Sequence, residues 1–447
     1  MYNVSFNIPD NVNVILDTLH DNGYEAYIVG GCVRDSLLGL QPKDWDICTS
    51  ALPPQILEVF NDKRIIETGL KHGTVTIVLD DEQYEITTYR TDGNYSDNRH
   101  PDSVTFVSNL KEDLARRDFT INAMAYNKQD GLIDYFNGYK DLKNGIISCV
   151  GDANERFNED ALRIMRALRF SSRYEIPIAE STQEAIHKNK DLLKNIAIER
   201  INSELCKLLL GYGGSYILAN YKDVITTIIP ELKPCIGFNQ NNRYHEYDVY
   251  DHIRHAVYNY GGSDLVVIIS LLLHDIGKPH CYTEDCNGGH FYGHGVVSHD
   301  IAEKVLDNLR FDNKTKHDVL ELVLYHDSTI EPTPKTVRRW LNKIGEKQFL
   351  RLLDIREADM LAHSKDTQKS RLERNDKLRK ILAEIIQSNQ CFTIKDLAIN
   401  GKDIIAMGVP EGKRIGEILN TVLNEVINET IVNERKFLLD YVYYNLV

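Results

Sequence analysis

Apolar and polar positions predict one helix and then a run of strands in the first quarter of the chain. The apolar residues that recur at helical spacing near the N-terminus are Val12, Ile15, Leu16 and Leu19. Short apolar or alternating runs between turn residues predict strands at 27–29, 45–48, 74–79, 84–89 and 105–107. A helix at 53–60 interrupts them, with prolines at its start, where they are tolerated. This region is therefore predicted to be a small α+β domain.

From about Asn154 the pattern becomes helical and stays so to the C-terminus. We therefore expect an α+β protein: an N-terminal head with a small mixed β-sheet, followed by all-α regions. The predicted domains are the head at 1–145, a helical neck at 146–238, a histidine-rich domain at 239–380 and a helical tail at 381–447.

Composition narrows the class of protein. The 447 residues are too many for one core, and 42% hydrophobic with 26% charged residues is ordinary for a globular protein. No apolar run reaches membrane-spanning length, and the N-terminus lacks a signal peptide. The eight scattered cysteines form no Cys-x-x-Cys pair, which favours the reducing cytoplasm. A net charge of −14 argues against a uniformly basic nucleic-acid binder, but it permits a local basic track.

The strongest candidate chemistry lies in YIVGGCVRDSLLGLQPKDWDICT, which begins at Tyr27. If Trp45 lies in a strand, the carboxylates of Asp44 and Asp46 point to the same face. Adjacent carboxylates suit Mg²⁺, and Gly30 and Gly31 let the backbone approach a phosphate closely. Alone, the Asp-x-Asp pattern fits a solvated strand equally well. Glu85 is a third candidate carboxylate that could complete a two-metal site, and a solvated strand residue is the alternative.

Taken together, these motifs resemble the class II tRNA nucleotidyltransferase and bacterial poly(A) polymerase family. The matching residues of the first motif are Gly30, Gly31, Val33, Arg34, Asp35, Asp44 and Asp46. RRDFTINA, from Arg116, and Glu-Asp-x-x-Arg, from Glu159, match further family motifs. The resemblance implies that Asp44, Asp46 and Glu85 are catalytic with Mg²⁺, that Arg117 contacts the triphosphate, and that Asp118 contacts the ribose. It also implies that the polar segment 90–101 is a flexible loop.

The expected nucleotide-binding residues are Gly30, Gly31, Arg34, Arg117, Asp118, Asn122, Asp160, Arg163, Arg166 and Arg169. Among them, Asp160 and Arg163 are predicted to share one helix face. Cytosine and adenine both offer an amino donor beside a ring-nitrogen acceptor, whereas uracil and guanine offer the reverse. An Asp accepts and an Arg donates, so this pair can select C and A. The alternative is a surface ion pair of little consequence.

Ten of the 15 histidines fall between His245 and His326. Imidazole and carboxylate are suitable ligands for transition metals. The order of these residues resembles the HD phosphohydrolase domain, including the string HDIGK. The resemblance implies a metal site, with a metal such as Mn²⁺ or Ni²⁺, made by His252, His274, Asp275, His294, His326 and Asp359. The domain is then either a phosphohydrolase or a scaffold.

In the tail, Lys402, Lys413 and Arg414 resemble the family's tRNA-gripping region, and solvated basic turns are the alternative. The expected function is template-independent addition of CMP and AMP, from CTP and ATP, to tRNA 3′ ends. Whether the chain adds the full CCA, only CC or only A stays open, and so do two alternative functions. One is a poly(A) polymerase, and the other is an HD phosphohydrolase that uses the head as an RNA-binding module.

Overall fold

The computed structural model describes residues 4–67, 69–93, 103–286 and 288–446. The chain forms two compact units, Met1–Pro230 and Glu231–Val447. The predicted division into four domains is finer than this one, and its boundaries remain predictions. Among the described residues, none of the helices combines the length and the apolar character needed to cross a lipid bilayer.

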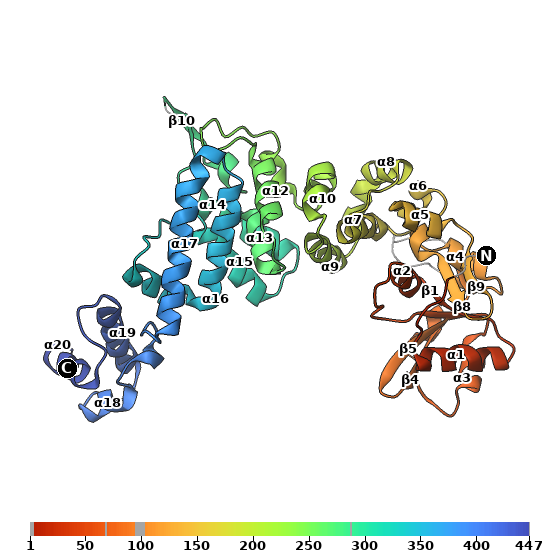
Figure 1. Cartoon of the computed structure of the whole chain (residues 1–447), viewed down its shortest axis with the longest axis horizontal. Coiled ribbons are helices and arrows are strands. Elements are labelled where there is room, and N and C mark those ends of the chain that lie inside the picture. Colours follow the sequence, from red (N-terminus) through yellow and green to blue (C-terminus); the bar gives the residue numbers. More distant parts are fainter. Residues whose placement is uncertain (1–3, 68, 94–102, 287, 447) are drawn as a thin grey trace. The chain divides into compact units, whose positions relative to one another are not determined.

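A mixed seven-stranded sheet forms the centre of the head in the first unit (Figure 1). Its strand order is β3-β4-β5-β2-β1-β8-β9, with β2 and β5 parallel and the other neighbours antiparallel. The strands are β1 (Ala26–Val29), β2 (Ile47–Thr49), β3 (Arg64–Ile66), β4 (Thr74–Leu79), β5 (Glu82–Thr88), β8 (Met124–Asn127) and β9 (Gly131–Asp134). The small mixed sheet predicted for the head is therefore confirmed.

Alternation along the strands sends side chains into two cores. Ile28, Ile47 and Ile86 pack on one face with helix α1 (Asp10–Asp21), whose buried residues are the predicted Val12, Ile15, Leu16 and Leu19. Helices α2 (Gly31–Leu37) and α3 (Pro53–Val59) cover the same face. Val29 and Cys48 pack on the other face, with helix α4 (Leu110–Ala115). Asp46 is the neighbour of Ile47 in the chain, so alternation places it on the opposite face of the sheet, which is the face that α4 covers.

Two predictions in the head need correction. The strand predicted at 45–48 begins at Ile47, so Asp44 and Asp46 precede it. Burial explains the shift, because residues 40–46 stay partly or fully accessible and burial begins at Ile47. The predicted loop at 90–101 begins as a strand, β6 (Arg90–Asp92), which pairs with β7 (Val104–Phe106). The rest of that loop, 94–101, lies outside the described residues.

At the C-terminal end of the head, a helix packs directly against the backbone of an earlier turn. Gly138 opens α5 (Gly138–Asn144), and a Cβ atom there would lie 2.1 Å from the carbonyl oxygen of Thr120. No side chain fits at that distance, so only glycine lets α5 sit against the turn Thr120–Asn122. The turn belongs to the RRDFTINA motif, and α5 therefore fixes that motif in place.

The rest of the first unit is helical, as predicted. Its helices are α6 (Ala153–Glu159), α7 (Leu162–Tyr174), α8 (Glu180–Asn189), α9 (Ile198–Leu209), α10 (Gly214–Asn220) and α11 (Lys222–Ile228). Helix α6 begins where the Asp152 carboxylate accepts hydrogen bonds from the N–H groups of Asn154 and Glu155. Helices α7 and α9 pack against each other, which places the arginines of α7 beside the acidic residues of α9.

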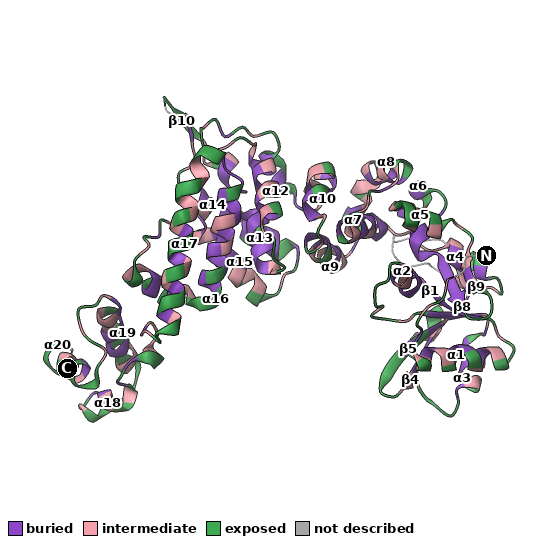
Figure 2. Ribbon diagram, viewed as in Figure 1, coloured by how far each residue is buried: buried purple, intermediate pink, exposed green. Residues whose placement is uncertain are grey.

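The second unit is also largely helical. Its helices are α12 (Val249–Asn259), α13 (Leu265–Leu273), α14 (His294–Asn308), α15 (Asn313–Tyr325), α16 (Pro334–Leu361), α17 (Lys365–Gln387), α18 (Gly401–Ala406), α19 (Lys413–Ile427) and α20 (Arg435–Asn445). A short hairpin, β10 (Thr283–Asp285) with β11 (Gly288–His290), adds to the predicted helices. Figure 2 shows α13 buried along nearly its whole length, as its sequence LVVIISLLL predicts. Residues 391–442 form a separate apolar core for the tail.

Candidate functional site

The turn between β1 and α2 brings a cation close to the backbone. Gly30 has φ 79°, a conformation that favours glycine, and a Cβ atom there would lie 3.0 Å from Nη1 of Arg117. Glycine is therefore required at position 30 for two reasons: the positive φ angle of the backbone and the close approach of the Arg117 guanidinium. Asp113 anchors that guanidinium, with Nη2 of Arg117 3.3 Å from its Oδ2. The predicted phosphate contact, Arg117, thus lies beside the predicted phosphate-binding turn.

Asp44 and Asp46 are both exposed, just before β2. The backbone still continues the sheet, because the Val29 N–H donates to the Asp46 carbonyl at 3.0 Å. Although Asp46 is exposed, the protein atoms around its carboxyl group remove part of its hydration, and this raises the pKa of Asp46; the negative charge of Asp44 raises it too, while the Arg117 guanidinium lowers it. Two mutually repelling carboxylates suit a bound divalent metal, whose charge would offset the part of their repulsion that Arg117 leaves.

Glu85 lies on β5, next to the strand that follows this pair. Ile47 is paired with Ile86, so continuing the register by one residue sets Asp46 opposite Glu85. Groups of three or more close metal-ligand atoms do occur among the described residues, but Asp44, Asp46 and Glu85 do not form one. A third carboxylate ligand at Glu85 therefore remains a prediction.

Arg34 and Asp118 lie in one buried network. The Arg34 guanidinium donates to Asp35 Oδ1 through Nε and Nη2, and to the side-chain oxygen of Asn122 through Nη1. Asn122 in turn donates to Asp118 Oδ1 at 3.0 Å, and Arg166 donates to Asp118 Oδ2 at 2.7 Å. Burial works against ionisation of Asp118, but Arg166 and Asn122 outweigh it and hold its pKa at about 2. Asp118 is therefore a permanent anion that joins the head to α7.

The prediction that Asp160 and Arg163 lie on one continuous helix face is wrong, and the alternative, an ion pair between them, does not form either. Asp160 ends α6 with extended backbone, and α7 begins only at Leu162, so the two residues do not share a continuous helix. Asp160 Oδ2 instead lies 3.4 Å from Nη2 of Arg200, and Arg163 Nη1 lies 2.7 Å from Glu159 Oε2. Both predicted base-reading groups are nevertheless held in place, each by a different partner.

The side chains that hold Asp160 and Arg163 in place are Glu159 and residues of α9. Glu159 also binds Arg156, 2.5 Å away, so it anchors two guanidinium groups. On α9, Arg200 braces Asp160, and Glu204 braces Arg169 with Oε2 3.1 Å from Nε. These two contacts fasten the junction of α6 and α7, and α7 itself, to α9.

In the second unit, the six predicted metal ligands lie in two adjoining groups. The first contains His252, His274, Asp275 and Asp359, and the second contains Asp275, His294 and His326. Within each group the ligand atoms lie within 4.8 Å of one another. Asp275 belongs to both groups, so its two oxygens could serve two metal ions.

The chemistry of this donor set fits metal binding. Asp275 and His274 are buried, yet both oxygens of Asp275 and Nε2 of His274 make no hydrogen bond of good geometry. Burial opposes the charge on His274, but Asp275 and Asp359 raise its pKa to about 10. Buried ligand atoms held in mutual electrostatic contact, without ordinary hydrogen bonds, are typical of a site that takes a transition metal.

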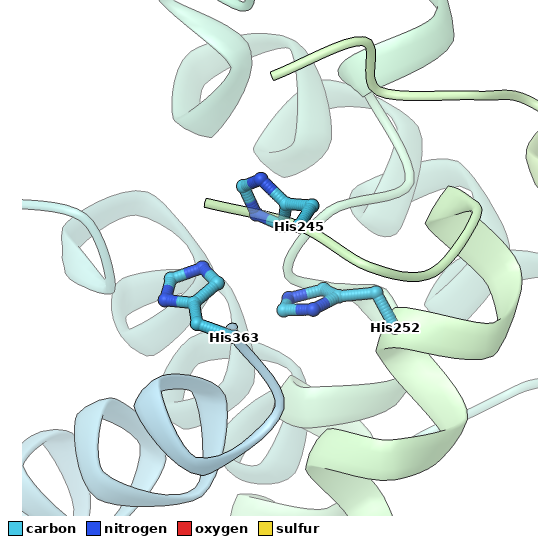
Figure 3. A group of neighbouring side chains, drawn as sticks. All are labelled: His245, His252 and His363. Carbon is cyan, nitrogen blue, oxygen red and sulfur yellow. The ribbon is translucent and has the colours of Figure 1, made fainter. Parts of the chain in front are cut away.

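Two more histidines, which sequence reasoning missed, complete this site. Figure 3 shows His245, His252 and His363 converging from three segments, and they form a third possible ligand group. His363 Nε2 lies 3.7 Å from Asp359 Oδ1, one helical turn along the chain. That spacing of four residues is the signal that could have identified His363. His255 and His299 lie outside all three groups, with His255 stacked on Tyr247 instead.

The groups open into a cavity of 790 Å³, whose lining carries three cationic side chains as well as the carboxylates of Asp275, Asp327 and Asp359. Lys278, Arg243 and Arg371 contribute to this lining, and Lys278 Nζ lies 2.7 Å from Asp275 Oδ2. An anionic substrate could therefore approach the metal ligands without meeting uncompensated negative charge.

The predicted RNA-binding residues of the tail are exposed. Lys402 lies in the first turn of α18, and Lys413 and Arg414 open α19. Arg414 lies 3.3 Å from Glu417, a surface ion pair of small energetic weight. All three side chains are accessible to a polyanion, and their role remains a prediction.

Comparison with known proteins identifies the family models and the relatives that this chain matches. Residues 26–148 match the model of the poly A polymerase head domain, 176–235 that of the probable RNA and SrmB-binding site of polymerase A, and 294–442 that of tRNA nucleotidyltransferase domain 2. The chain is 35% identical to a CCA-adding enzyme of Ligilactobacillus salivarius, over 97% of this chain and 96% of that one. It is 34% identical to a CCA-adding enzyme of Oceanobacillus iheyensis, over 96% of each chain.

The fold has solved counterparts. The CCA-adding enzyme of Bacillus stearothermophilus, solved in complex with CTP, superposes with a TM-score of 0.71 at 30% identity. That match covers 96% of this chain and 95% of the other. A Thermotoga maritima CCA-adding enzyme, complexed with tRNA, shares the fold with a TM-score of 0.60 at 21% identity.

Proposed function

This chain belongs to the family of CCA-adding enzymes, and from that premise we propose that it adds CMP and AMP to tRNA 3′ ends in the order C, C, A. Its substrates are then CTP, ATP and tRNA, and its reaction is nucleotidyl transfer without a template. One observation carries this proposal: Arg117 lies beside the Gly30 turn, and its charge also acts on Asp46, where it lowers the pKa of the carboxyl group. A phosphate-binding cation thus adjoins both the phosphate-binding turn and the acidic pair.

We assign the acidic pair to a divalent metal, with Mg²⁺ as its identity. When bound, this metal supplies a positive charge that lowers the cost of the developing negative charge on the reacting oxygens. Asp44 and Asp46 hold it, and Arg117 together with the amides of the Gly30–Gly31 turn holds the triphosphate. Asp118 and Arg34 orient the rest of the nucleotide, and pyrophosphate leaves when the tRNA 3′-oxygen bonds to the α-phosphorus.

Base selection falls to the junction of α6 and α7. Asp160 accepts from the amino group of cytosine or adenine, and Arg163 donates to the adjacent ring nitrogen. Arg200 holds the acceptor and Glu159 holds the donor, so Asp160 and Arg163 are not paired with each other and their remaining acceptor and donor groups can pair with a base.

The test uses tRNA transcripts that end before CCA, after C and after CC, with CTP and ATP supplied singly and together. Sequencing of the 3′ ends should show two C residues from CTP alone, and a single A only after CC. EDTA should stop addition, and Mg²⁺ should restore it. Long A tails on any RNA would point to a poly(A) polymerase instead. We place this reaction in the cytoplasm, because all eight cysteines are free thiols.

For the second unit we propose metal-dependent phosphohydrolase activity. The convergence of His252, His274, Asp275, His294, His326 and Asp359 supports it. Mn²⁺ or Ni²⁺ suits these imidazole ligands. Phosphomonoesters and 2′,3′-cyclic nucleotides, offered with Mn²⁺, Ni²⁺, Co²⁺ or Mg²⁺, should be hydrolysed. If none is hydrolysed, the second unit is a scaffold.

A further inference from the structure

A small cationic cavity lies at the C-terminal end of α7, away from the base-selecting residues. Its volume is 240 Å³, and its lining consists of Arg169, Arg173, Lys207, Leu210, Gly211 and Tyr212. Three of these side chains are cations, and one is an aromatic ring. Single-stranded nucleic acids are bound by this combination, because cations hold the backbone and a ring stacks on a base.

Tyr212 is presented to solvent in an unusual way. It is 86% exposed, and its ring has no hydrogen-bond or ring partner among the residues that the structure describes. The loop that carries it is nevertheless pressed onto α7. A Cβ atom at Gly211 would lie 2.3 Å from Ser172 Oγ, and the Gly213 N–H donates to the Ser172 carbonyl at 2.9 Å. Glycine on both sides therefore fixes the backbone while the tyrosine ring stays free.

Two of the three cations beside Tyr212 are less neutralised than Arg163 and Arg166, whereas the third, Arg169, is paired with Glu204 at 3.1 Å. Arg163 and Arg166 have carboxylate oxygens at 2.7 and 2.6 Å. Arg173 and Lys207 have theirs only at 3.9 Å, from Asp35 and Glu204, and about half of each side chain is exposed. Attraction for a phosphate is therefore strongest at this end of the helix.

The distance along α7 between this cavity and Arg163 shows that the cavity cannot hold the base that pairs with Arg163. Arg163 and Arg173 lie ten residues apart on one helix, which corresponds to roughly 15 Å along its axis. A base that pairs with Arg163 cannot reach Tyr212. The contact from Arg173 to Asp35 leads back to Arg34 and α2, so the cavity still adjoins the proposed nucleotide site.

We propose that this cavity binds the 3′ strand of tRNA just before its growing end, with one base stacked on Tyr212 and its phosphates held by Arg173 and Lys207. The inference rests on the proposed CCA addition, and it assigns a primer-positioning role to Tyr212. The family match over 176–235, to a probable RNA-binding site, includes both Lys207 and Tyr212 and supports the choice of RNA.

The first test compares Tyr212→Ala with Tyr212→Phe in the full-length protein. Tyr212→Ala should raise KM for a tRNA lacking CCA by about 5- to 100-fold and leave KM for CTP within about twofold, because only stacking of the RNA is lost. Tyr212→Phe keeps the ring and should restore KM. The matched control is Tyr216→Ala, which removes a nearby exposed tyrosine that lines a different cavity. An unchanged tRNA KM in Tyr212→Ala, or an equal rise in Tyr216→Ala, would overturn the inference.

The second test is direct. A tRNA with 2-aminopurine as its last base before CCA should lose fluorescence on binding the wild-type protein and keep it on binding Tyr212→Ala at saturation. Lys207→Ala should lower the slope of log affinity against log salt by about 0.7, the value for one phosphate contact on a single strand. Equal quenching by both proteins refutes the subsite, as does a rise in KM for CTP alone, which would mean that the cavity serves the incoming nucleotide. Failure of the wild-type protein to add CMP refutes the proposed function instead.

Discussion

Replacing Arg163 with alanine should abolish discrimination between CTP and UTP, even where activity survives. In the structure Arg163 is 7% exposed, and its guanidinium donates to Glu159 and to the carbonyls of Arg116 and Arg156. Arg offers five N–H donors, so two remain for a base. One charge-assisted hydrogen bond contributes about 1.5–3 kcal/mol, which corresponds to roughly ten- to a hundredfold in kcat/KM for CTP.

The same substitution also destabilises the fold, because it leaves buried carbonyls without their donor, at about 1–3 kcal/mol for each. Raw activity therefore cannot separate selection from folding. The ratio of kcat/KM for CTP to that for UTP can, because the folded fraction multiplies both values equally and cancels. UTP should lose little, since it presents an N–H where cytosine has its ring-nitrogen acceptor.

The assay measures kcat/KM for all four nucleotides on a tRNA lacking CCA, with wild type, Asp160→Ala and Arg163→Ala. Arg156→Ala is the matched control, because Arg156 shares the Glu159 carboxylate but is not predicted to touch the base. Its CTP-to-UTP ratio should stay at the wild-type value. A ratio that is unchanged in Arg163→Ala, or that collapses equally in Arg156→Ala, would refute base reading by this side chain.

Three further predictions concern the acidic pair, the histidine site and the link between the head and α7. Asp44→Ala or Asp46→Ala should abolish nucleotide addition while tRNA still binds in a filter assay; wild-type addition rates at matched Mg²⁺ would exclude the metal role. His274→Ala combined with Asp275→Ala should remove phosphoester hydrolysis and leave CMP addition intact, and parallel loss of both would contradict separate sites. Asp118→Asn should lower the free energy of unfolding at pH 7 by about 2 kcal/mol, because its folded pKa of about 2 lies below the ordinary 3.8. That contribution is complete above pH 3.8 and is lost as pH falls towards 2, so urea denaturation curves of mutant and wild type should converge there.

Local features of the fold could be predicted from the sequence. The buried face of α1 and the bounds of β4 follow from apolar spacing alone, since burial is periodic within each element. The partner of Asp160 could not be predicted in this way. Helical spacing suggested Arg163, whereas a break between α6 and α7 turns Asp160 towards Arg200, 40 residues later.

For the histidine site, too, the sequence predicted some of the neighbouring residues and missed others. The residues of the HD pattern were predicted from their order, and the structure brings them together. His245 and His363 belong to no part of that pattern. The four-residue spacing from Asp359 points to His363, but only packing of the segment before α12 against the end of α16 places His245 beside His252 and His363. Contacts made by tertiary packing are not encoded in local periodicity.

An interior strand of the head sheet, β1, has a consequence for synthesis on the ribosome. β1 pairs with β2 soon after both are made, but its other neighbour is β8, and Ile28 faces Tyr126, 98 residues later (126 − 28). Closing so long a loop costs entropy before the pairing can repay it, and such non-local contacts form slowly. The nascent chain therefore carries Asp44 and Asp46 on an incomplete sheet until β8 leaves the exit tunnel. Neither carboxylate has its full surroundings until Arg117, and then α7, have also emerged, so a ribosome that stalls within the first hundred codons releases a head without a working site.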